Sequence, residues 1–500
     1  MQALLRQPLM VLLVGFAALA MMVPAIHAAT ADQFRVARAF LQSALLLAVL
    51  SGLLAAALTG FRPANVARSH LAQLAGGFVL LPLSLALPLW RLVPETGLLD
   101  GWFDMLACFT GTGAVMPLPG APPSLLLWRG IVGWSGGLLT LVAAVSILAP
   151  MTLGGFEVLT AQQAGQGAGG AITGRGRGQM VTQIARIPDP SERMRRYAGQ
   201  IAPVYLGLTL LLWLALVVAG DSALAGIGRA MAVLSTSGIE TAPAGSGRVG
   251  ELLCLGFFTF ALSRAAMPLS HRRTAGPGLL HDREFRLALT VGGGLAVGLT
   301  LLALHRGAGV GAIWAGLFDA MSFLTGTGLM AAPAADVPLL PWLVLAALAL
   351  IGGGIATTSG GLKLLRLGAI LSHARHEAER LIHPHAVGRA GSGARDLRRQ
   401  GGQVAWIFAL LLILTLAVAM LGLTLFGLGL EPALMLAVAA LTNTGPLAIW
   451  AGAAPDVWAD LPVLAKLLVM ALMVLGRLET LTLIALFAAP PWRQRNRPVA

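Results

Sequence analysis

The stretch SFLTGTGLMAAP, residues 322–333, is polar and rich in glycine, yet it lies between two long apolar runs. A close relative occurs earlier in the chain. Residues 103–113 read FDMLACFTGTG and residues 318–328 read FDAMSFLTGTG, so Phe, Asp and Thr-Gly-Thr-Gly recur at identical offsets. Two weaker copies are RAMAVLSTSG at 229–238 and LAVAALTNTG at 436–445. Each copy is a mostly apolar segment ending in Thr/Ser-x-Thr/Ser-Gly, which indicates an internal fourfold repeat.

Composition indicates a membrane protein. Of 500 residues, 57% are hydrophobic and 11% are charged, and apolar stretches of about 20 residues recur, each long enough to cross a hydrocarbon core. We therefore expect an all-α polytopic membrane protein with about ten spans, at roughly 8–28, 39–60, 70–92, 126–150, 200–219, 250–269, 286–305, 340–370, 404–429 and 463–489. The first span, from Leu9 to Ala28, also fits a cleaved secretory signal, but a retained span gives the better charge balance.

The distribution of charge predicts the orientation. With ten spans both termini share one side, and the arginine clusters at 175–196 and 375–399 fall there. The positive-inside rule assigns that side to the cytoplasm, so the net charge of +13 requires no nucleic-acid partner. The opposite side keeps more acidic than basic residues, including Asp104, Asp221 and Asp319. Such a surface either concentrates cations or is what the sorting of basic residues leaves behind.

The four polar loops have a physical use at membrane depth. Non-helical backbone is tolerated there only where protein buries it or where it lines water. Backbone carbonyls can replace the hydration shell of a cation, and glycine allows consecutive carbonyls to turn towards one axis. Threonine and serine hydroxyls can add ligands or brace the loop from behind. Four such loops around one axis predict a lined ion path rather than four surface turns.

Longer segments resemble the Trk/Ktr/HKT superfamily of potassium transporters, specifically its bacterial TrkH type. LLLWRGIVGWSGGLLTLVAAVSILAP (125–150) is similar to the helix after the first filter of the family, and IGGGIATTSGGLKLLRL (351–367) to its glycine-rich third-repeat helix. RLIHPHAV (380–387) resembles a cytoplasmic loop signature, and LLVMALMVLGRLETLTLIALFAAPPWR (467–493) resembles the last helix. The resemblance covers nearly the whole chain, including two additional N-terminal spans.

The resemblance implies potassium uptake, with the potassium ion as substrate and no covalent cofactor. By family position the ion contacts fall on four tetrads: Thr110, Gly111, Thr112 and Gly113; Ser235, Thr236, Ser237 and Gly238; Thr325, Gly326, Thr327 and Gly328; Thr442, Asn443, Thr444 and Gly445. In the superfamily a serine at the position of Gly113 accompanies sodium transport, so this chain resembles the potassium-selective members.

The chain also departs from the family pattern. Gly111 and Gly326 stand where threonine is common, and Asn443 replaces a smaller residue or another asparagine. The second-repeat helix, LCLGFFTFALSRAAMPLS, lacks the glycine pair and the asparagine usual there. The changes within the tetrads bear on how strongly potassium is preferred over sodium more than on which of the two ions is preferred.

The resemblance further implies how the chain is divided and with what it associates. Two N-terminal spans (1–62) precede repeat 1 (63–155), a cytoplasmic linker (156–198), repeat 2 (199–272), repeat 3 (273–372), a second linker (373–402) and repeat 4 (403–500). We expect a homodimer in lipid, in the bacterial cytoplasmic (inner) membrane with both termini cytoplasmic. A cytoplasmic nucleotide-binding regulatory subunit (TrkA-like) is expected to open it.

A second constellation lies in the third-repeat helix. Glycines bracket residues 357–359 there, and each destabilises a helix by roughly 1 kcal/mol relative to alanine, which predicts a local break. The family position makes this an intramembrane gate, with candidate residues Gly353, Gly354, Gly360, Gly361, Lys363 and Arg477. Close packing of small residues between helices is the alternative.

Ionisable residues inside a membrane mark functional positions by default. Arg477 and Glu479 lie well inside the last span. In the family the matching arginine faces the pore beneath the filter, where a fixed positive charge opposes free ion flow. The alternative is a structural pair or an arginine bound to carbonyls. Lys363 either closes over the pore or marks the membrane boundary, and for Arg366 we expect a residue that snorkels at the cytoplasmic boundary.

Other functions are less well supported. Potassium symport coupled to sodium or protons would use the same scaffold, but the chain offers no convincing carboxylate pair for a second site. A membrane enzyme would need clustered carboxylates or His/Cys ligands facing the membrane interior, so we expect no enzyme. HARHEAERLIHPH (373–385) gathers four histidines without the order of a zinc hydrolase. It favours a solvated amphipathic loop over a metal site.

Overall fold

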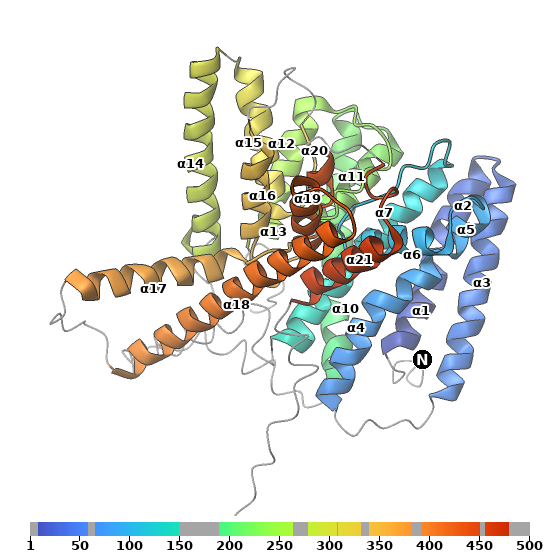
Figure 1. The fold of residues 1–500 in the computed structure, drawn as a ribbon. Helices are drawn as coiled ribbons and strands as arrows, with labels where there is room; N and C mark the ends of the chain where they lie inside the picture. The colour runs from blue at the N-terminus through green and yellow to red at the C-terminus, as the bar shows by residue number, and fades with distance from the viewer. Residues whose placement is uncertain are drawn as a thin grey trace, which may run out of the picture.

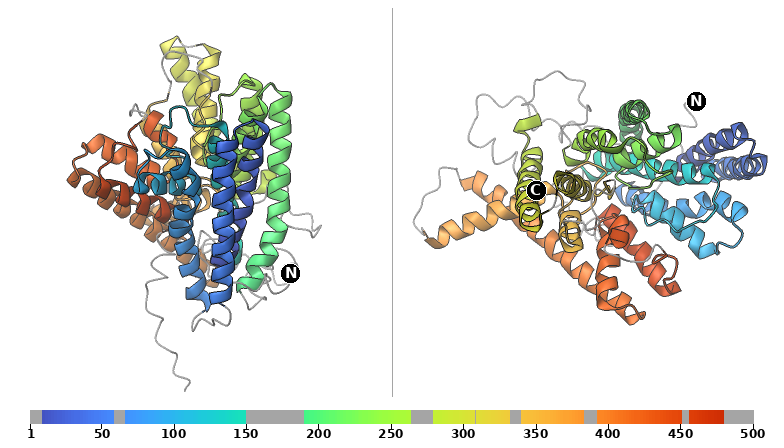
Figure 2. Two further views of the ribbon diagram at one scale, coloured as in Figure 1. Left: turned by 90° about the vertical axis from the view of Figure 1, so that its right-hand side faces the viewer. Right: turned by 90° about the horizontal axis from the view of Figure 1, so that it is seen from above.

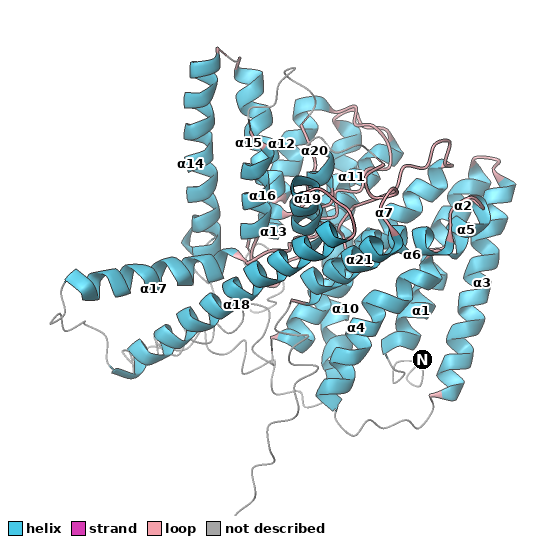
Figure 3. Ribbon diagram, in the orientation of Figure 1, coloured by secondary structure: helices cyan, strands magenta, loops and turns pink. Residues whose placement is uncertain are grey.

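The computed structural model describes residues 9–58, 66–149, 190–263, 279–307, 309–331, 340–382, 392–450 and 456–479. Within these ranges the chain is helical and has no β-strand (Figure 3). Seven helical stretches of the described chain are long and apolar enough to cross a membrane: Leu9–Thr30, Phe34–Ala57, Leu71–Leu92, Pro123–Leu148, Glu192–Val218, Arg283–Arg306 and Gly401–Leu425. The predicted all-α polytopic class is confirmed.

The elements follow one another without a separate soluble unit in the described residues. In chain order they are α1 (Leu9–Ala20), α2 (Met22–Thr30), α3 (Phe34–Ala57), α4 (Val66–Leu85), α5 (Leu87–Leu92), α6 (Leu98–Phe109), α7 (Pro123–Ala143), the π-helical turn η2 (Ala144–Leu148), α10 (Pro190–Val218), α11 (Ala223–Ser235), α12 (Gly247–Phe257), α13 (Thr259–Leu262), the 3-10 turn η4 (Leu279–His281), α14 (Arg283–Arg306), α15 (Val310–Thr325), α16 (Trp342–Ile351), α17 (Leu364–Ile382), α18 (Ser392–Leu425), α19 (Leu430–Leu441), α20 (Pro446–Trp450) and α21 (Val463–Leu478).

The helices after α3 are arranged around a common centre (Figures 1 and 2) and form four sets. Each set has a first long helix, a short pore helix and a second helix: α4, α6 and α7; α10, α11 and α12; α14, α15 and α16; α18, α19 and α21. The second helix of each set packs against the pore helix of the next: α7 on α11, α12 on α15, α16 on α19, and α21 on α6. Because the last contact returns to the first set, the arrangement is a closed ring.

The two additional N-terminal spans lie outside this ring. Helices α1 and α2 together form the first span, and both pack on α3. They join the ring through the first set, where α1 contacts α4 and α2 contacts α7 (Figure 1). The fold is therefore two N-terminal spans plus four pseudo-symmetric repeats, whose predicted sequence boundaries remain predictions.

Several of the expected spans are divided within the described residues. The span at 250–269 appears as α12 and α13, which ends at Leu262. The span at 463–489 is described only to Glu479. The span at 340–370 stops at Ile351 because Gly352 has a φ of 70°, which no right-handed helix accommodates. The linker residues 156–189, the RLIHPHAV residues from His383 onward and the chain after Glu479 lie outside the described residues.

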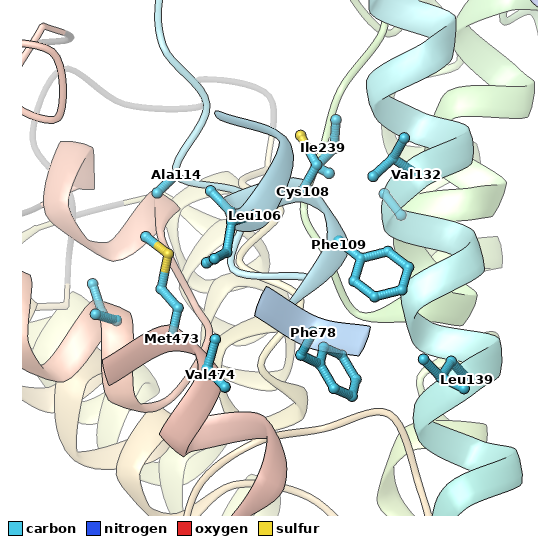
Figure 4. Packing of buried hydrophobic residues seen from close by; sticks show 14 of the residues in the cluster. Phe78, Leu106, Cys108, Phe109, Ala114, Val132, Leu139, Ile239, Met473 and Val474 are labelled. Atoms are coloured by element: carbon cyan, nitrogen blue, oxygen red, sulfur yellow. The ribbon is translucent and has the colours of Figure 1, made fainter. Parts of the chain in front are cut away.

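The pore helix of the first set is enclosed by apolar side chains. Figure 4 shows Leu106, Cys108 and Phe109 of α6 surrounded by side chains from other elements. The rings of Phe78 on α4 and Phe109 have centroids 5.3 Å apart, and all of these residues are buried. Because lipid is itself apolar, such an interface is held by close packing and polar contacts rather than by exclusion of water.

Candidate functional site

Every pore helix leads directly into its tetrad with the same backbone geometry. The second residue of each tetrad has a positive φ: 66° at Gly111, 52° at Thr236, 76° at Gly326 and 54° at Asn443. The amide of each third residue donates to the carbonyl five residues earlier: Thr112 to Ala107 (2.9 Å), Ser237 to Ala232 (3.0 Å), Thr327 to Ser322 (2.9 Å) and Thr444 to Ala439 (2.9 Å). All four pore helices thus end in a Schellman motif.

This geometry explains the departures at the second tetrad position. A non-glycine residue in the left-handed region is disfavoured by roughly 1–2 kcal/mol, with asparagine among the better tolerated types. Gly111 and Gly326 adopt the required conformation without that penalty, and Asn443 is a suitable substitute. The backbone geometry therefore accommodates Gly111, Gly326 and Asn443 at the second tetrad position.

The first-position hydroxyls of the tetrads brace the loops. Each donates to a carbonyl of its own pore helix: Thr110 to Leu106 (2.8 Å), Ser235 to Met231 (2.6 Å), Thr325 to Ser322 (2.8 Å) and Thr442 to Val438 (2.8 Å). In three loops the first and third hydroxyls also bond to each other: Thr110 with Thr112 (2.8 Å), Ser235 with Ser237 (2.9 Å) and Thr325 with Thr327 (2.9 Å). These hydroxyls turn towards the scaffold and leave the backbone carbonyls as the candidate ligands.

The tetrads contact one another in a closed, directional ring. In three of four steps the fourth-position glycine of one loop lies so close to the third-position carbonyl oxygen of the next that a β-carbon would not fit: Gly113 on Ser237, Gly238 on Thr327, and Gly445 on Thr112. The last of these is also a hydrogen bond, 2.5 Å from Gly445 N to Thr112 O. The step from the third loop to the fourth differs, because Gly328 faces the side chain of Pro446.

The recurring Phe-Asp pair fixes the chain that leaves the tetrad. Asp104 accepts a hydrogen bond from Met116 N (3.0 Å), and Asp319 accepts one from Ala331 N (2.8 Å), an identical separation of twelve residues. Asp104 also binds Arg129 through two hydrogen bonds, 2.9 Å from Nε and 2.7 Å from Nη2. The sequence motif thus encodes a brace between the pore helices of the first and third repeats and the segments that follow their tetrads.

The second repeat uses different residues for the same purpose. Arg229 stands at the offset of the two aspartates and binds Asp221 (3.1 Å) and the Ser246 hydroxyl (2.9 Å). Burial acts to raise the pKa of Asp221, but the amides of Ser246 and Gly245 hold it below its ordinary value. Asp104, Asp221 and Asp319 are each at least 95% buried, so these three carboxylates serve as internal braces and add little to an exposed acidic surface.

An irregular segment, residues 352–363 between α16 and α17, lies directly against the ring; we call it the intramembrane loop. A β-carbon on Gly360 would collide with the carbonyl of Thr442, the first residue of the fourth tetrad. Thr358 donates from Oγ1 to the carbonyl of Leu234, which precedes the second tetrad (3.2 Å). The helix break expected from the glycines is therefore present, and it faces the first-position residues of the tetrads.

The other side of the intramembrane loop rests on neighbouring helices. Gly354 N donates to Ala261 O (2.9 Å), and Ile355 N donates to Oε1 of the buried Glu284 at the start of α14 (2.8 Å). Gly353 packs against the same Ala261 carbonyl too closely for a β-carbon. These candidate gate glycines are thus sites of close backbone approach, and Gly361 has a φ of 79°.

Arg477 links the ring to the intramembrane loop. Its Nε donates to the carbonyl of Thr110 in the first tetrad, and its Nη1 donates to the carbonyl of Thr358. Lys363 donates from Nζ to the carbonyl of Ser359. Both cations line a small cavity between η2, the intramembrane loop and the end of α21. Arg477 is therefore bound to carbonyls at the lower edge of the ring rather than paired with Glu479.

The expectation for Arg366 is wrong. Instead of snorkelling at a membrane boundary, its side chain is fully buried, 2.8 Å from Glu479 through Nη2. Its guanidinium also lies 3.7 Å from the centroid of the Phe408 ring. Burial of an arginine requires such a partner, and Glu479, which follows α21, supplies it. The pair joins α17 to the last helix.

The histidine-rich segment is helical where it is described. His373 and His376 lie on α17, which continues to Ile382, whereas His383 and His385 lie outside the described residues. Among the described residues no group of three or more His, Cys, Asp or Glu side chains could hold a metal ion. The described part therefore corresponds to an amphipathic helix rather than a loop.

Several residues of the site were missed by sequence reasoning. Arg129, Glu284 and Pro446 hold the tetrads or the intramembrane loop, and none has a motif of its own. A signal did exist for Asp104 and Asp319, because the Phe-Asp pair recurs at a fixed offset from both tetrads. No comparable pattern precedes Glu284, which acts on a loop 71 residues away.

The fold and the ring of tetrads define a polytopic helical membrane protein with a pseudo-fourfold re-entrant core, and comparisons with known proteins agree. Residues 307–493 match the family model TrkH, described as cation transport protein. The Trk system potassium uptake protein TrkH of Escherichia coli K12 is 28% identical over 418 residues, covering 80% of this chain and 81% of that protein. TrkI of Halomonas elongata, another Trk system potassium uptake protein, is 28% identical over 422 residues, covering 82% and 81%.

A solved structure agrees as well. The crystal structure of the potassium transporter TrkH from Vibrio parahaemolyticus superposes with a TM-score of 0.77, covering 98% of this chain and 99% of that chain at 22% identity. The resemblance inferred from the sequence is confirmed. The chain is thus similar to the Trk system potassium uptake proteins, and its fold is that of the potassium transporter TrkH.

Proposed function

We propose that this chain takes up potassium across the bacterial cytoplasmic membrane by selective permeation through the ring of tetrads. The observation that carries the proposal is the directional ring itself, in which three of the four fourth-position glycines lie against third-position carbonyls of neighbouring loops. Backbone carbonyls around one axis replace the hydration shell of a cation without fixed charge. A membrane potential of 100 mV supplies about 2.3 kcal/mol per ion, enough to drive accumulation without a coupled ion.

The ends of the pore helices support the same role. Each pore helix directs the partly negative end of its dipole towards the ring, because the tetrad follows its C-terminus. Glycine at the fourth tetrad position allows three of the loops to approach a neighbouring carbonyl more closely than a β-carbon would permit. Selectivity for potassium follows from a ring whose spacing is fixed by these contacts and by the Schellman motifs behind them.

Gating is assigned to the intramembrane loop with Arg477 and Lys363. Two fixed positive charges beside the ring oppose a passing cation, and a unit charge at 4 Å is worth about 4 kcal/mol at an effective dielectric constant of 20. Arg477 also ties the loop to the first tetrad. The Arg477→Gln variant should therefore conduct faster than the wild type. An unchanged or lower flux, with the protein folded, would show that Arg477 only braces the scaffold.

The orientation in the membrane, the regulatory partner and the oligomeric state are proposed on the same basis. Both termini lie in the cytoplasm, a cytoplasmic nucleotide-binding subunit moves the intramembrane loop, and the protein works as a homodimer in the inner membrane. Related proteins are named as parts of a Trk system, which supports a second component. A blue-native gel and a pull-down with the cognate nucleotide-binding subunit test these assignments.

The test of the proposed function is cation flux into proteoliposomes carrying this protein alone, driven by an imposed potential. We expect flux of potassium and rubidium well above that of sodium and lithium, and entry of sodium in the Gly113→Ser variant. If potassium flux depends strictly on a sodium or proton gradient, the protein is a symporter rather than a permeation pathway. No flux under any gradient, with and without the cytoplasmic subunit, would overturn the proposal.

A further inference from the structure

The residue that follows the fourth tetrad occupies a place unlike its three counterparts. The residues after the four tetrads are Ala114, Ile239, Leu329 and Pro446. The first three are at least 97% buried in the scaffold, whereas Pro446 is partly exposed and begins the short helix α20. Gly445, just before it, is also the only one of the fourth-position glycines without a positive φ. The fourth repeat therefore leaves the ring in a different direction.

The side chain of Pro446 reaches the fourth-position glycines of all three other loops. A β-carbon on Gly238 or on Gly328 would lie 3.1 Å from Cγ of Pro446, and one on Gly113 would lie 3.7 Å from its Cδ. Glycines from three separate loops share a neighbour only near the axis around which those loops are arranged. Pro446 therefore lies over the ring rather than on its circumference.

Pro446 is at the opposite end of the ring from the intramembrane loop. That loop and Arg477 contact the first tetrad position, through the carbonyls of Thr442 and Thr110. Pro446 contacts the fourth position, at the far end of each tetrad. The path through the ring of tetrads is thus bounded at one end by the intramembrane loop with the cations Arg477 and Lys363. At the other end it is bounded by the uncharged side chain of Pro446.

The chemistry of proline suits such a place. Proline has no backbone N–H, so Pro446 adds no donor that would repel a cation beside the carbonyls. Its pyrrolidine ring takes the position that, by the pseudo-symmetry, the Thr444 carbonyl would hold against Gly328. An apolar group there offers no ligand to a hydrated ion and narrows the passage, so an entering cation must release water before the carbonyls receive it.

We propose that Pro446 is a specificity-determining residue that narrows the end of the ring opposite the intramembrane loop and excludes hydrated cations. The inference rests on the proposed function, since it assigns a role within the same ion path. Small cations hold their water more tightly than potassium or rubidium. A narrow apolar entrance therefore favours the larger ions, and its removal should admit sodium and lithium.

Two substitutions test this role by flux. Pro446→Ala keeps a residue that can begin α20, and Pro446→Gly removes the side chain altogether. We expect the ratio of rubidium to sodium flux to fall about tenfold in Pro446→Gly, the change that ~1.4 kcal/mol produces, with a smaller fall in Pro446→Ala. Pro432→Ala, an exposed proline in the first turn of α19, is the matched control and should keep the wild-type ratio. An unchanged ratio in both Pro446 variants overturns the proposal.

A labelling experiment tests the location without requiring transport. The two native cysteines, Cys108 and Cys254, are buried, so a cationic methanethiosulfonate reagent reports on an introduced thiol. In Pro446→Cys, potassium should slow modification relative to N-methylglucamine, and modification should block rubidium influx. Pro432→Cys should react equally in both salts and keep its flux. Potassium-independent labelling, or labelled protein that transports normally, overturns the proposal. A wild-type protein without flux would overturn the proposed function alone, because the labelling comparison still reports a cation beside Pro446.

Discussion

The buried pair of Arg366 and Glu479 provides a quantitative test of how α17 is held to the last helix. Arg366 is fully buried, Glu479 is 8% exposed, and their side chains are 2.8 Å apart. Removing one partner of a buried pair typically costs 3–5 kcal/mol because the other charge stays buried. The stacking of Arg366 on Phe408 is present in both the wild type and the variant, so it does not change the difference. We therefore expect Glu479→Gln to lower the free energy of unfolding by about 3–5 kcal/mol.

The assay is unfolding of the purified protein in mixed detergent micelles, followed by tryptophan fluorescence. The comparison is Asp100→Asn, which removes the partner of Lys466 from a pair in which Asp100 is 36% exposed and Lys466 is 8% exposed. Because solvent reaches the Asp100 end of this pair and screens it, this variant should cost less than Glu479→Gln. The double variant Arg366→Met/Glu479→Met should regain much of the loss, because no charge is left buried. Equal effects of Glu479→Gln and Asp100→Asn would refute the reasoning.

Two further comparisons use matched pairs of variants. Gly238→Ala meets both a positive φ of 61° and the Thr327 carbonyl, whereas Gly120→Ala meets a φ of 72° in open space. We expect Gly120→Ala to cost about 1–2 kcal/mol and Gly238→Ala more than that, with reduced selectivity; equal losses in thermal unfolding would contradict the tight contact. Asp104→Asn leaves Arg129 buried without a carboxylate and should cost about 3–5 kcal/mol. Asp319→Asn can still accept its backbone hydrogen bond and should cost less, so the reverse order would refute the assignment.

The fold and the tetrads could be predicted because both depend on local patterns. Long apolar stretches indicate spans, and the repeated Thr/Ser-x-Thr/Ser-Gly identifies the re-entrant loops before any contact is known. The break at Gly352 was predictable for the same reason, since dense glycines disfavour a helix wherever they occur. These features follow from the residues themselves and from backbone geometry.

The rest depends on contacts between distant segments. Arg366 looks like a boundary residue because it follows the glycine-rich break, and only the approach of the last helix brings Glu479 to it. Likewise, nothing in the sequence shows that Asp104 and Asp221 are buried. In the structure Asp104 is paired with Arg129, and Asp221 accepts a hydrogen bond from the amide of Ser246. Pro446 appears to be an ordinary residue at the start of a helix. Its place over the ring appears only when all four loops are assembled.

The most direct test of the central claim is to locate the ion. Crystals of the protein grown in rubidium should show anomalous density on the axis of the ring, bounded by the backbone carbonyls of the tetrads and lying between Pro446 and the intramembrane loop. Sodium should not displace it at equal concentration. Rubidium density only outside the ring, in protein that transports rubidium in vesicles, would contradict the account and place the ion path elsewhere.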